Sequence, residues 1–349
     1  MTSTVRREQN GVTRRRFLLR AAAAAAFAAG CRSGDTRARL RVMLNGGIYE
    51  ELARRLVVQP FERDTGVGVD IVPGSASEMI ARLRAEQAAP TIDVAIVDRL
   101  VIGANLDAAL FEKIDPSNIP NMQSLSPEAI DPAGYGPIVH CHNMAIGYNT
   151  KRLQVEPPKS WADLWDARFT QLVVPGVIEL TPGLLFLLQA NVLNGGTYDN
   201  VEPGFEAMRR LKPNLRRFYR SIGEVRPMLN NENVVVAIGT NIIQGEIDRG
   251  NPIAVVMPQE GCLASPAAAQ VIKGCRAKAT AERFIDYYLR PDAQSGWARE
   301  YFVSVFNQKA DVPATLKSRI GEHIVFFDAD RVSRGREAWI DRWTREVRG

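Results

Sequence analysis

Short apolar runs alternate with longer amphipathic segments along most of this chain. An apolar run bounded by turn residues predicts a strand, and apolar positions three and four apart predict a helix. Because the two kinds of segment alternate, we expect an α/β fold with a mainly parallel sheet. The predicted strands are 40–44, 67–72, 92–97, 172–174, 234–238 and 253–256. The predicted helices are 48–65, 78–86, a segment ending at Leu110, 182–193, 202–211, 242–249, 279–289 and 334–347.

Local signals support several of these elements. Ser75 followed by Glu78 has the spacing of a capping box, which marks the start of a helix. Segment 92–97 is almost continuously apolar, as expected for a strand buried on both faces. Trp339 and Trp343 are four residues apart, so they share one face of the last helix, and we expect them to pack in a core.

The chain begins with a different pattern. Residues 13–31 read TRRRFLLRAAAAAAFAAGC, a basic start followed by an apolar stretch that is too short to span a bilayer. This layout predicts an export signal over residues 1–30. Residues 13–18 resemble the twin-arginine export motif. Residues 28–31 resemble a lipoprotein processing box, which implies a periplasmic protein anchored in the membrane by a lipid on Cys31. Ordinary cleavage nearby, which leaves Cys31 free or removes it, is the alternative.

Composition narrows the class of protein. The first thirty residues contain six arginines and one glutamate, so they account for the whole net charge of +5, and no nucleic-acid partner is expected. The remaining 319 residues are more than a single hydrophobic core usually accommodates, so we expect two domains. No later segment is long and apolar enough for a membrane helix. The pairing of Cys141, Cys262 and Cys275 stays open.

Catalytic motifs are absent from the sequence. It contains no G-x-S-x-G elbow, no phosphate loop and no H-E-x-x-H pair. Its three histidines are His140, His142 and His323. We therefore expect a protein that is not an enzyme and that uses no cofactor and no metal.

Five segments together carry a resemblance to a known family. They are QPFERDTGVGVDIV, AIVDRL with FEKID, MAIGYNTKRL, SWADLW and AERFIDYYLRPDAQ. In this set the chain resembles bacterial periplasmic solute-binding proteins of ABC importers, in particular the spermidine/putrescine-binding family, over about residues 40–310.

The resemblance implies a two-lobed periplasmic-binding fold of type II, in which each lobe is a mostly parallel sheet with flanking helices and the ligand cleft lies between the lobes. The implied lobes are 38–140 plus 265–303, and 141–264 plus 304–349. It also implies a monomeric extracytoplasmic receptor. Such a receptor captures a small polar or amine-bearing organic solute and delivers it to an ABC permease in the inner membrane.

Ligands of open α/β sheets lie beyond the carboxyl ends of strands. Four such ends are polar or small here: 45–47, Asp98, 181–183 and 239–241. Thr181 and Asn241 are expected to cap helices, whose positive ends suit an anionic or oxygen-rich group, while Asp98 suits an amine. Ordinary turns and caps are the alternative for each loop. The candidate ligand-binding residues are Gly46, Gly47, Tyr49, Asp98, His142, Thr181, Gly183, Gly239, Thr240, Asn241 and Ser265.

The cleft differs from that of the polyamine-binding relatives. Aligned without gaps, the relatives' aromatic and acidic cleft residues mostly meet small or apolar residues here, and one carboxylate is gained where they have a serine. Most of the aromatic rings and carboxylates that would bind a di-cation are therefore missing here. We expect the transport role without polyamine as the solute. The positions concerned are Gly46, Leu100, 181–183 with Glu179 nearby, Gly239, Ser265, Ala267 and the gained Asp98.

Two other functions remain open at this point. His140 and His142 are two apart on a predicted crossover strand, so they share one face and could contribute to an iron-type metal receptor. A hydrolase that uses the cleft, with Asp98 or Glu179 as its base, is the other alternative, although the sequence offers no partner set for it.

Overall fold

The computed structural model describes residues 39–349 except 103–108, 315, 317–323 and 348–349. The predicted export signal and Cys31 lie outside the described residues. So do His323 and most of the helix predicted to end at Leu110. None of the helices in the described part of the chain is long and apolar enough to cross a membrane.

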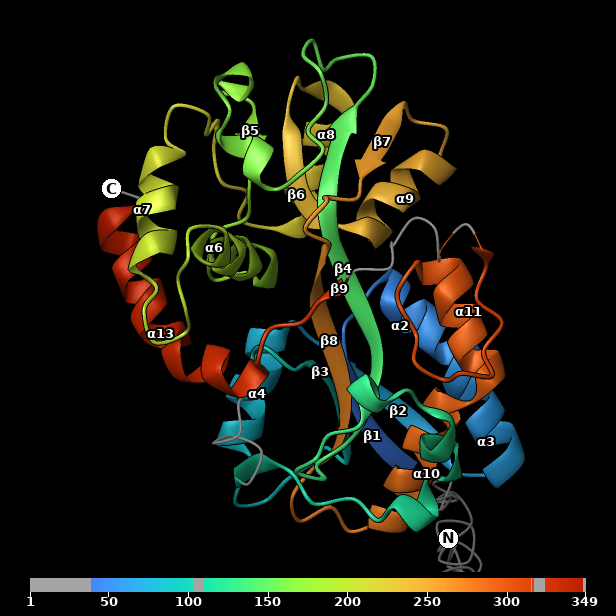
Figure 1. Ribbon diagram of the computed structural model, residues 1–349. Coiled ribbons are helices and arrows are strands. Elements are labelled where there is room, and N and C mark those ends of the chain that lie inside the picture. The colour runs from blue at the N-terminus through green and yellow to red at the C-terminus, as the bar shows by residue number, and fades with distance from the viewer. Residues whose placement is uncertain (1–38, 103–108, 315, 317–323, 348–349) are drawn as a thin grey trace, which may run out of the picture. The chain divides into compact units, whose positions relative to one another are not determined.

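One mixed sheet runs through the described residues, in the strand order β2-β1-β3-β8-β4-β6-β5, with β7 paired to β4 and β9 to β8 (Figure 1). The pairs β1–β2, β1–β3 and β5–β6 are parallel, as predicted, whereas β4 and β8 pair with their main neighbours in antiparallel fashion. The strands are β1 (Arg39–Leu44), β2 (Gly68–Pro73), β3 (Val94–Asp98), β4 (Ile138–Asn149), β5 (Val173–Val174), β6 (Val235–Gly239), β7 (Ile253–Val256), β8 (Cys262–Val271) and β9 (Ile324–Val325).

The two longest strands, β4 and β8, connect the parallel groups. The first half of β4 pairs with β8, with His140 opposite Ala267 and His142 opposite Ser265. Its second half pairs with β6 and β7. Since β8 also pairs with β3, the two strands join the group β1–β3 to the group β5–β7 in one continuous sheet. A solute-binding cleft at this junction would therefore have β4 and β8 as its floor.

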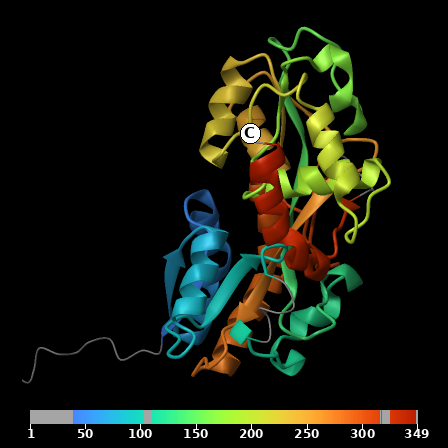
Figure 2. The same cartoon turned by 90° about the vertical axis from the view of Figure 1, so that its left-hand side faces the viewer.

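Helices flank the sheet, most of them where the sequence predicts them (Figures 1 and 2). Segment 48–65 is helical throughout and ends at Gly66, whose φ of 71° is the left-handed conformation that glycine tolerates. The helices are α2 (Ile48–Ala53), the π-helical η1 (Arg54–Val58), α3 (Gln59–Thr65), α4 (Ala76–Ala85), α6 (Thr181–Leu193), α7 (Glu202–Arg210), α8 (Val225–Asn231), α9 (Thr240–Asp248), α10 (Lys278–Leu289), α11 (Pro291–Tyr301) and α13 (Ala329–Glu346). Short 3₁₀ turns are η2 (Pro116–Asn118), η3 (Pro120–Ser124), η4 (Pro127–Ala129), η5 (Ala162–Trp165), η6 (Ala167–Phe169) and η7 (Ile222–Glu224).

Local signals at two helix ends can be compared with the structure. The capping box at α4 is confirmed, because Ser75 Oγ accepts a bond from the Glu78 amide and the Glu78 carboxylate accepts one from the Ser75 amide. The helix predicted over 279–289 is confirmed as α10, which ends at Leu289. Pro291 begins a further helix, α11, which the sequence did not predict, and its fixed φ and missing N–H are tolerated at that first position.

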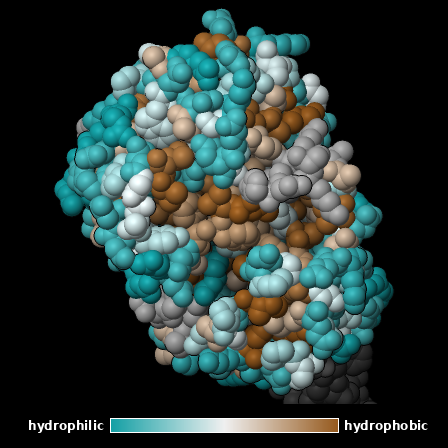
Figure 3. Space-filling view, in the orientation of Figure 1, coloured by the Kyte–Doolittle hydropathy of each residue, from teal (hydrophilic) through white to brown (hydrophobic). Residues whose placement is uncertain are grey.

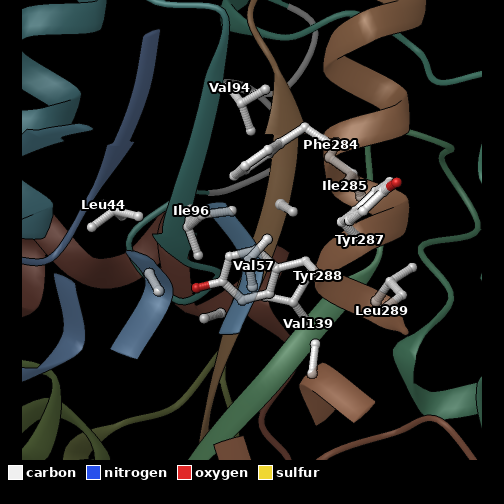
Figure 4. Packing of buried hydrophobic residues seen from close by; sticks show 14 of the residues in the cluster. Leu44, Val57, Val94, Ile96, Val139, Phe284, Ile285, Tyr287, Tyr288 and Leu289 are labelled. Carbon is white, nitrogen blue, oxygen red and sulfur yellow. The ribbon is translucent and has the colours of Figure 1, made fainter. Parts of the chain in front are cut away.

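Alternation along the strands divides the core into layers. On β1, Val42 and Leu44 pack with α2, α3, α10 and α11, while Met43 faces α4 on the other side. On β3, Val94 and Ile96 face the first layer. Figure 4 shows Phe284 and Tyr288 of α10 extending toward these β3 side chains. Period-two alternation thus gives β1 and β3 two buried faces.

The group around β6 has its own core. Val235 and Ala237 of β6 pack with α6, α7 and α13, and the alternate β6 residues pack with α8 and α9. Helix α6 is apolar on all sides and is largely buried. Trp339 and Trp343 of α13 belong to this core, which confirms their predicted packing role. Figure 3 shows apolar residues gathered toward the middle of the face in view and hydrophilic residues around its rim.

We predict that Phe284→Ala destabilises the protein by about 3–5 kcal/mol, because Phe284 is fully buried between α10 and the sheet and its loss leaves a cavity. Urea unfolding followed by tryptophan fluorescence would measure this loss. Arg283→Ala, at the exposed neighbouring position of the same helix, is the control and should change stability little. A loss below about 1 kcal/mol for Phe284→Ala would contradict the packing described.

Candidate functional site

Two adjoining cavities of about 190 and 210 Å³ lie where β3, β4 and β8 meet the starts of α6 and α9. They share six lining residues, so we treat them together as the cleft. The shared residues are Asn45, His142, Thr181, Pro182, Ile222 and Ser265. Seven of the predicted ligand-binding residues line the cleft: Tyr49, Asp98, His142, Thr181, Gly239, Asn241 and Ser265.

Two larger hollows, of about 930 and 900 Å³, lie elsewhere on the described surface. They are lined by charged side chains such as Arg283 and Arg276 and contain none of the predicted residues. Volume alone would favour them. The cleft is the stronger candidate because strand ends and helix starts converge on it, as expected for ligand sites of α/β sheets.

Asp98, the last residue of β3, is at the centre of the cleft. Its Oδ2 accepts hydrogen bonds from the hydroxyls of Thr181, at 2.8 Å, and Ser265, at 2.7 Å. Its Oδ1 accepts a bond from the Leu100 amide at 2.9 Å. Burial raises the pKa of Asp98, and these bonds, together with the charge of Arg336, act against that rise. The carboxylate therefore holds three segments of the chain at one point.

The helix starts differ in detail from the sequence expectation. Thr181 is the first residue of α6 rather than its cap, and its hydroxyl donates to Asp98 instead of accepting from the helix. Asn241 is the second residue of α9, whose cap position is Gly239. In the part of the chain that the structure describes, no side chain caps either helix start. The dipole at both ends consequently faces the cleft without a side-chain acceptor of its own.

Two neutral imidazoles form the floor of the cleft on β4. His140 is completely buried, and neither of its ring nitrogens has a hydrogen-bond partner among the described residues. It stacks on Trp297 at a centroid distance of 5.4 Å and meets His142 edge-on at 5.2 Å. Burial lowers the pKa of His142 to about 4 and that of His140 well below its usual range. As predicted, both rings lie on one side of the strand, and each can offer one donor and one acceptor.

Four predicted residues do not line the cleft. Gly46 and Gly47 are exposed in the turn before α2, and Gly47 has a φ of 69°, so they serve the turn. Gly183 is buried in α6, where a Cβ would lie 2.0 Å from the Val177 carbonyl oxygen. Thr240 is 1% exposed within the start of α9. These positions follow strand ends as expected; the turn accounts for the two exposed glycines, and close packing accounts for Gly183 and Thr240.

Some cleft residues gave no sequence signal. Ile222 comes from the short turn η7, lines both cavities and is still 39% exposed. Tyr301 ends α11 and is hydrogen-bonded to Asn241. Both belong to segments that do not follow a strand, so a search of strand ends could not find them.

The alternatives open at the sequence level find no specific support. The described residues contain no group of three or more His, Cys, Asp or Glu side chains placed to hold a metal ion. The Asp98 carboxylate is engaged by two hydroxyls and an amide. The three described cysteines are free thiols. Cys141 pairs with Pro266 across β4 and β8, which places Cys262 four residues further along and out of disulfide reach.

Comparison with known proteins gives a consistent result. Residues 89–328 match the family model described as bacterial extracellular solute-binding protein. The chain is 26% identical over 274 residues to the gamma-aminobutyric acid-binding protein of Pseudomonas aeruginosa, covering 75% of each chain. It is 24% identical over 246 residues to the spermidine/putrescine-binding periplasmic protein of Salmonella typhimurium, covering 68% of this chain and 69% of that one.

The fold also matches solved structures. One is the crystal structure of an ABC transporter protein from Clostridium perfringens, with a TM-score of 0.75 and 24% identity, covering 88% of this chain and 99% of that chain. The structure is a mixed α/β fold of the two-lobed periplasmic-binding type, as the sequence predicted. The matching proteins are named for binding or transport.

We predict that stability falls as the pH drops from about 6.5 toward 4. In this window the unfolded chain protonates its histidines, whose pKa is about 6.5, while His140 and His142 stay neutral in the native state. The two neutral histidines therefore contribute fully to the free energy of unfolding above pH 6.5, and this contribution is lost as the pH falls from 6.5 toward 4. His142→Asn should therefore show a shallower loss of Tm than the wild type between pH 6.5 and 4.5. Parallel curves for the two proteins would contradict the burial of a neutral His142.

Proposed function

This chain belongs to the family of bacterial extracellular solute-binding proteins, and from that premise we propose that it is the receptor of an ABC importer for a small solute with one ammonium group. The solute binds in the cleft, and the loaded protein, a monomer, docks on a permease in the inner membrane. The protein performs no chemistry on the solute.

The negative charge of Asp98 is the main support for an ammonium-bearing solute. Among the cleft-lining residues of the described chain, Asp98 is the one with a charged side chain. A partly buried carboxylate favours a cationic group beside it. A second ammonium group would meet no second carboxylate in the described lining, which supports a monoamine over a polyamine. The relatives named for gamma-aminobutyric acid and for spermidine and putrescine share an ammonium group in their ligands.

The other end of the solute would face the helix starts. Thr181 and Pro182 at α6, and Gly239 and Asn241 at α9, line the cavity of about 210 Å³ that adjoins Asp98. Positive helix ends favour a carboxylate or another oxygen-rich group. His142 lies between the two cavities and, as a neutral imidazole, can donate or accept a bond. An amino acid or a similar small zwitterion would satisfy both ends.

Closure of two lobes would trap the solute. We assign the lobes as 38–140 plus 265–303 and 141–264 plus 304–349, with hinges in β4 and β8 and between α11 and β9. The separate cores around β1–β3 and around β6 support this division. Asp98 and Thr181 belong to different lobes in this assignment, so their hydrogen bond would form only when the lobes are closed.

Export and anchoring belong to the same proposal. A receptor that delivers its solute to a permease has to be located outside the inner membrane and close to its surface. The basic and apolar segment over residues 1–30 supports export by the twin-arginine route into the periplasm. Residues 28–31 support lipidation of Cys31, which would retain the receptor at the membrane surface.

We predict that Asp98→Asn weakens binding of γ-aminobutyrate at least about tenfold, because a charge-assisted hydrogen bond is replaced by a neutral one. Isothermal titration of the purified protein would measure the affinity, with a thermal-shift comparison of putrescine and spermidine, which should shift Tm less. Glu179→Gln removes a carboxylate outside the cleft lining and is the matched control. Equal affinity of Asp98→Asn and wild type would remove Asp98 from the solute site.

We predict that Cys31→Ala moves the protein from the membrane fraction to the soluble periplasmic fraction, because the lipid-bearing sulfur is lost. Cell fractionation followed by immunoblotting would show this. Cys275→Ala, which removes a thiol far along the chain, should leave the wild-type distribution unchanged. Membrane retention of Cys31→Ala would argue against a lipid anchor at this residue.

A further inference from the structure

A polar side chain in the lining of the cleft lacks a hydrogen-bond partner. His140 of β4 is completely buried, and neither its Nδ1 nor its Nε2 is paired among the described residues. It lines the cavity of about 190 Å³ together with Asp98. A buried polar group without a partner is costly, and native proteins usually pair such a group with the chain, an ordered water or a ligand. The partner of this imidazole therefore has to come from the cavity.

Aromatic rings pack around the imidazole. Trp297 of α11 stacks on it at a centroid distance of 5.4 Å, and Tyr49 of α2 lies at 5.4 Å in a tilted arrangement. Tyr288 of α10 stacks at 6.4 Å, and His142 meets the ring edge-on at 5.2 Å. The hydroxyls of Tyr49 and Tyr288 are hydrogen-bonded to each other at 2.8 Å. These contacts fix the position of the imidazole without pairing its nitrogens.

Strand register places His140 in line with Asp98. Ala267 of β8 pairs with Asp98 of β3 on one side and with His140 of β4 on the other. Directly paired residues point to the same face of a sheet, so the three side chains form one row across three neighbouring strands (Figure 1). Two strand spacings of about 4.8 Å separate the two outer residues. Ala267 in the middle lines the same cavity with only a methyl group, which leaves space between the carboxylate and the imidazole.

The lining limits the chemistry of a group that can reach the imidazole. Burial lowers the pKa of His140 well below its usual range, so the ring is neutral and offers one donor and one acceptor. A second ammonium group would meet no second carboxylate in the described lining, and an anion would lie close to the negative charge of Asp98. An apolar group would leave both imidazole nitrogens unpaired. A hydroxyl or an uncharged amide satisfies the ring without these costs.

We propose that His140 is a specificity-determining residue of the cleft: its imidazole hydrogen-bonds an uncharged hydroxyl or amide that the solute carries a few bonds away from its ammonium group. The solute class narrows from simple amines to amino compounds with a hydroxyl or amide side group. The placement of the ammonium group at Asp98 rests on the proposed function. Asp98, Ala267 and His140 all fall within the lobe assigned as 38–140 plus 265–303, so their row does not depend on lobe closure.

Two probes that differ by one hydroxyl test the proposal. Isothermal titration would compare γ-aminobutyrate with both enantiomers of 4-amino-3-hydroxybutyrate. The wild type should bind the better enantiomer at least about tenfold more tightly than γ-aminobutyrate, because only the hydroxylated probe supplies a partner to His140. H140F keeps a planar ring against Trp297 but removes both nitrogens, so it should bind the two probes almost equally. H140N and H140Q place an amide near one or the other nitrogen, and one of them should restore part of the preference.

W297F is the control, because it changes the same cluster of rings at a residue that does not line the cleft. It should keep the wild-type preference for the hydroxylated probe. Equal affinity of the wild type for the two probes would overturn the proposal. A preference that survives in H140F would overturn it as well, since another residue would then bind the hydroxyl.

The ring nitrogens of His140 can also be observed without a solute. The chain has three histidines, so the His140 signals in a ¹H–¹⁵N spectrum of the imidazole rings can be assigned by their loss in H140F. We expect the acceptor nitrogen at the chemical shift of an unbonded imidazole in the solute-free protein, and a move toward the hydrogen-bonded value when the hydroxylated probe is added. A hydrogen-bonded shift in the solute-free protein would assign the ring to an ordered water or another group and overturn the proposal. Failure of the wild type to bind either probe would count against the proposed function, and the solute-free spectrum would still decide whether the ring lacks a partner.

Discussion

One carboxylate oxygen of Asp98 accepts hydrogen bonds from two hydroxyls that come from distant parts of the chain. Such a charge is costly to bury, and it is tolerated here because three donors and a nearby arginine act together. The end of β3, the middle of β8 and the start of α6 are thereby held within one hydrogen bond of a common point. The remaining features of the cleft are arranged around this interaction.

The sheet explains why these segments can meet. β4 and β8 run through both halves of the sheet, so a residue in the middle of either strand belongs to the junction. His142 and Ser265 are opposite each other at that position. The parallel strand β3 and the helices α6 and α9 contribute their ends to the same place. The junction contains two cavities of about 190 and 210 Å³, lined by both polar and apolar side chains.

The sequence predicted the regular parts of the fold well, because their signals are local. Helix 48–65 and the capping box at Ser75 follow directly from periodicity and cap chemistry. Strand β8 was missed because its residues are mostly small and gave no apolar run. Helix α11 was also missed; only Arg290 separates its first residue, Pro291, from the end of α10.

The site was predictable only in part, for a similar reason. The rule that ligands bind at strand ends found Asp98 and Thr181, but it also selected Gly183, which is buried against the Val177 carbonyl. Arg336 lies more than 230 residues from Asp98 in the chain, and its relation to the cleft arises only when α13 packs. The sequence signal for Arg336 is its position within an apolar stripe of the last helix, and this signal does not identify the residues near its side chain.

The most direct test of this account is a crystal structure of the protein with a bound amine such as γ-aminobutyrate. The account predicts the ammonium nitrogen within about 3 Å of an Asp98 carboxylate oxygen, with the carboxylate of the solute toward the starts of α6 and α9. An amine bound in the cleft with its nitrogen away from Asp98, or bound outside the cleft altogether, would contradict it.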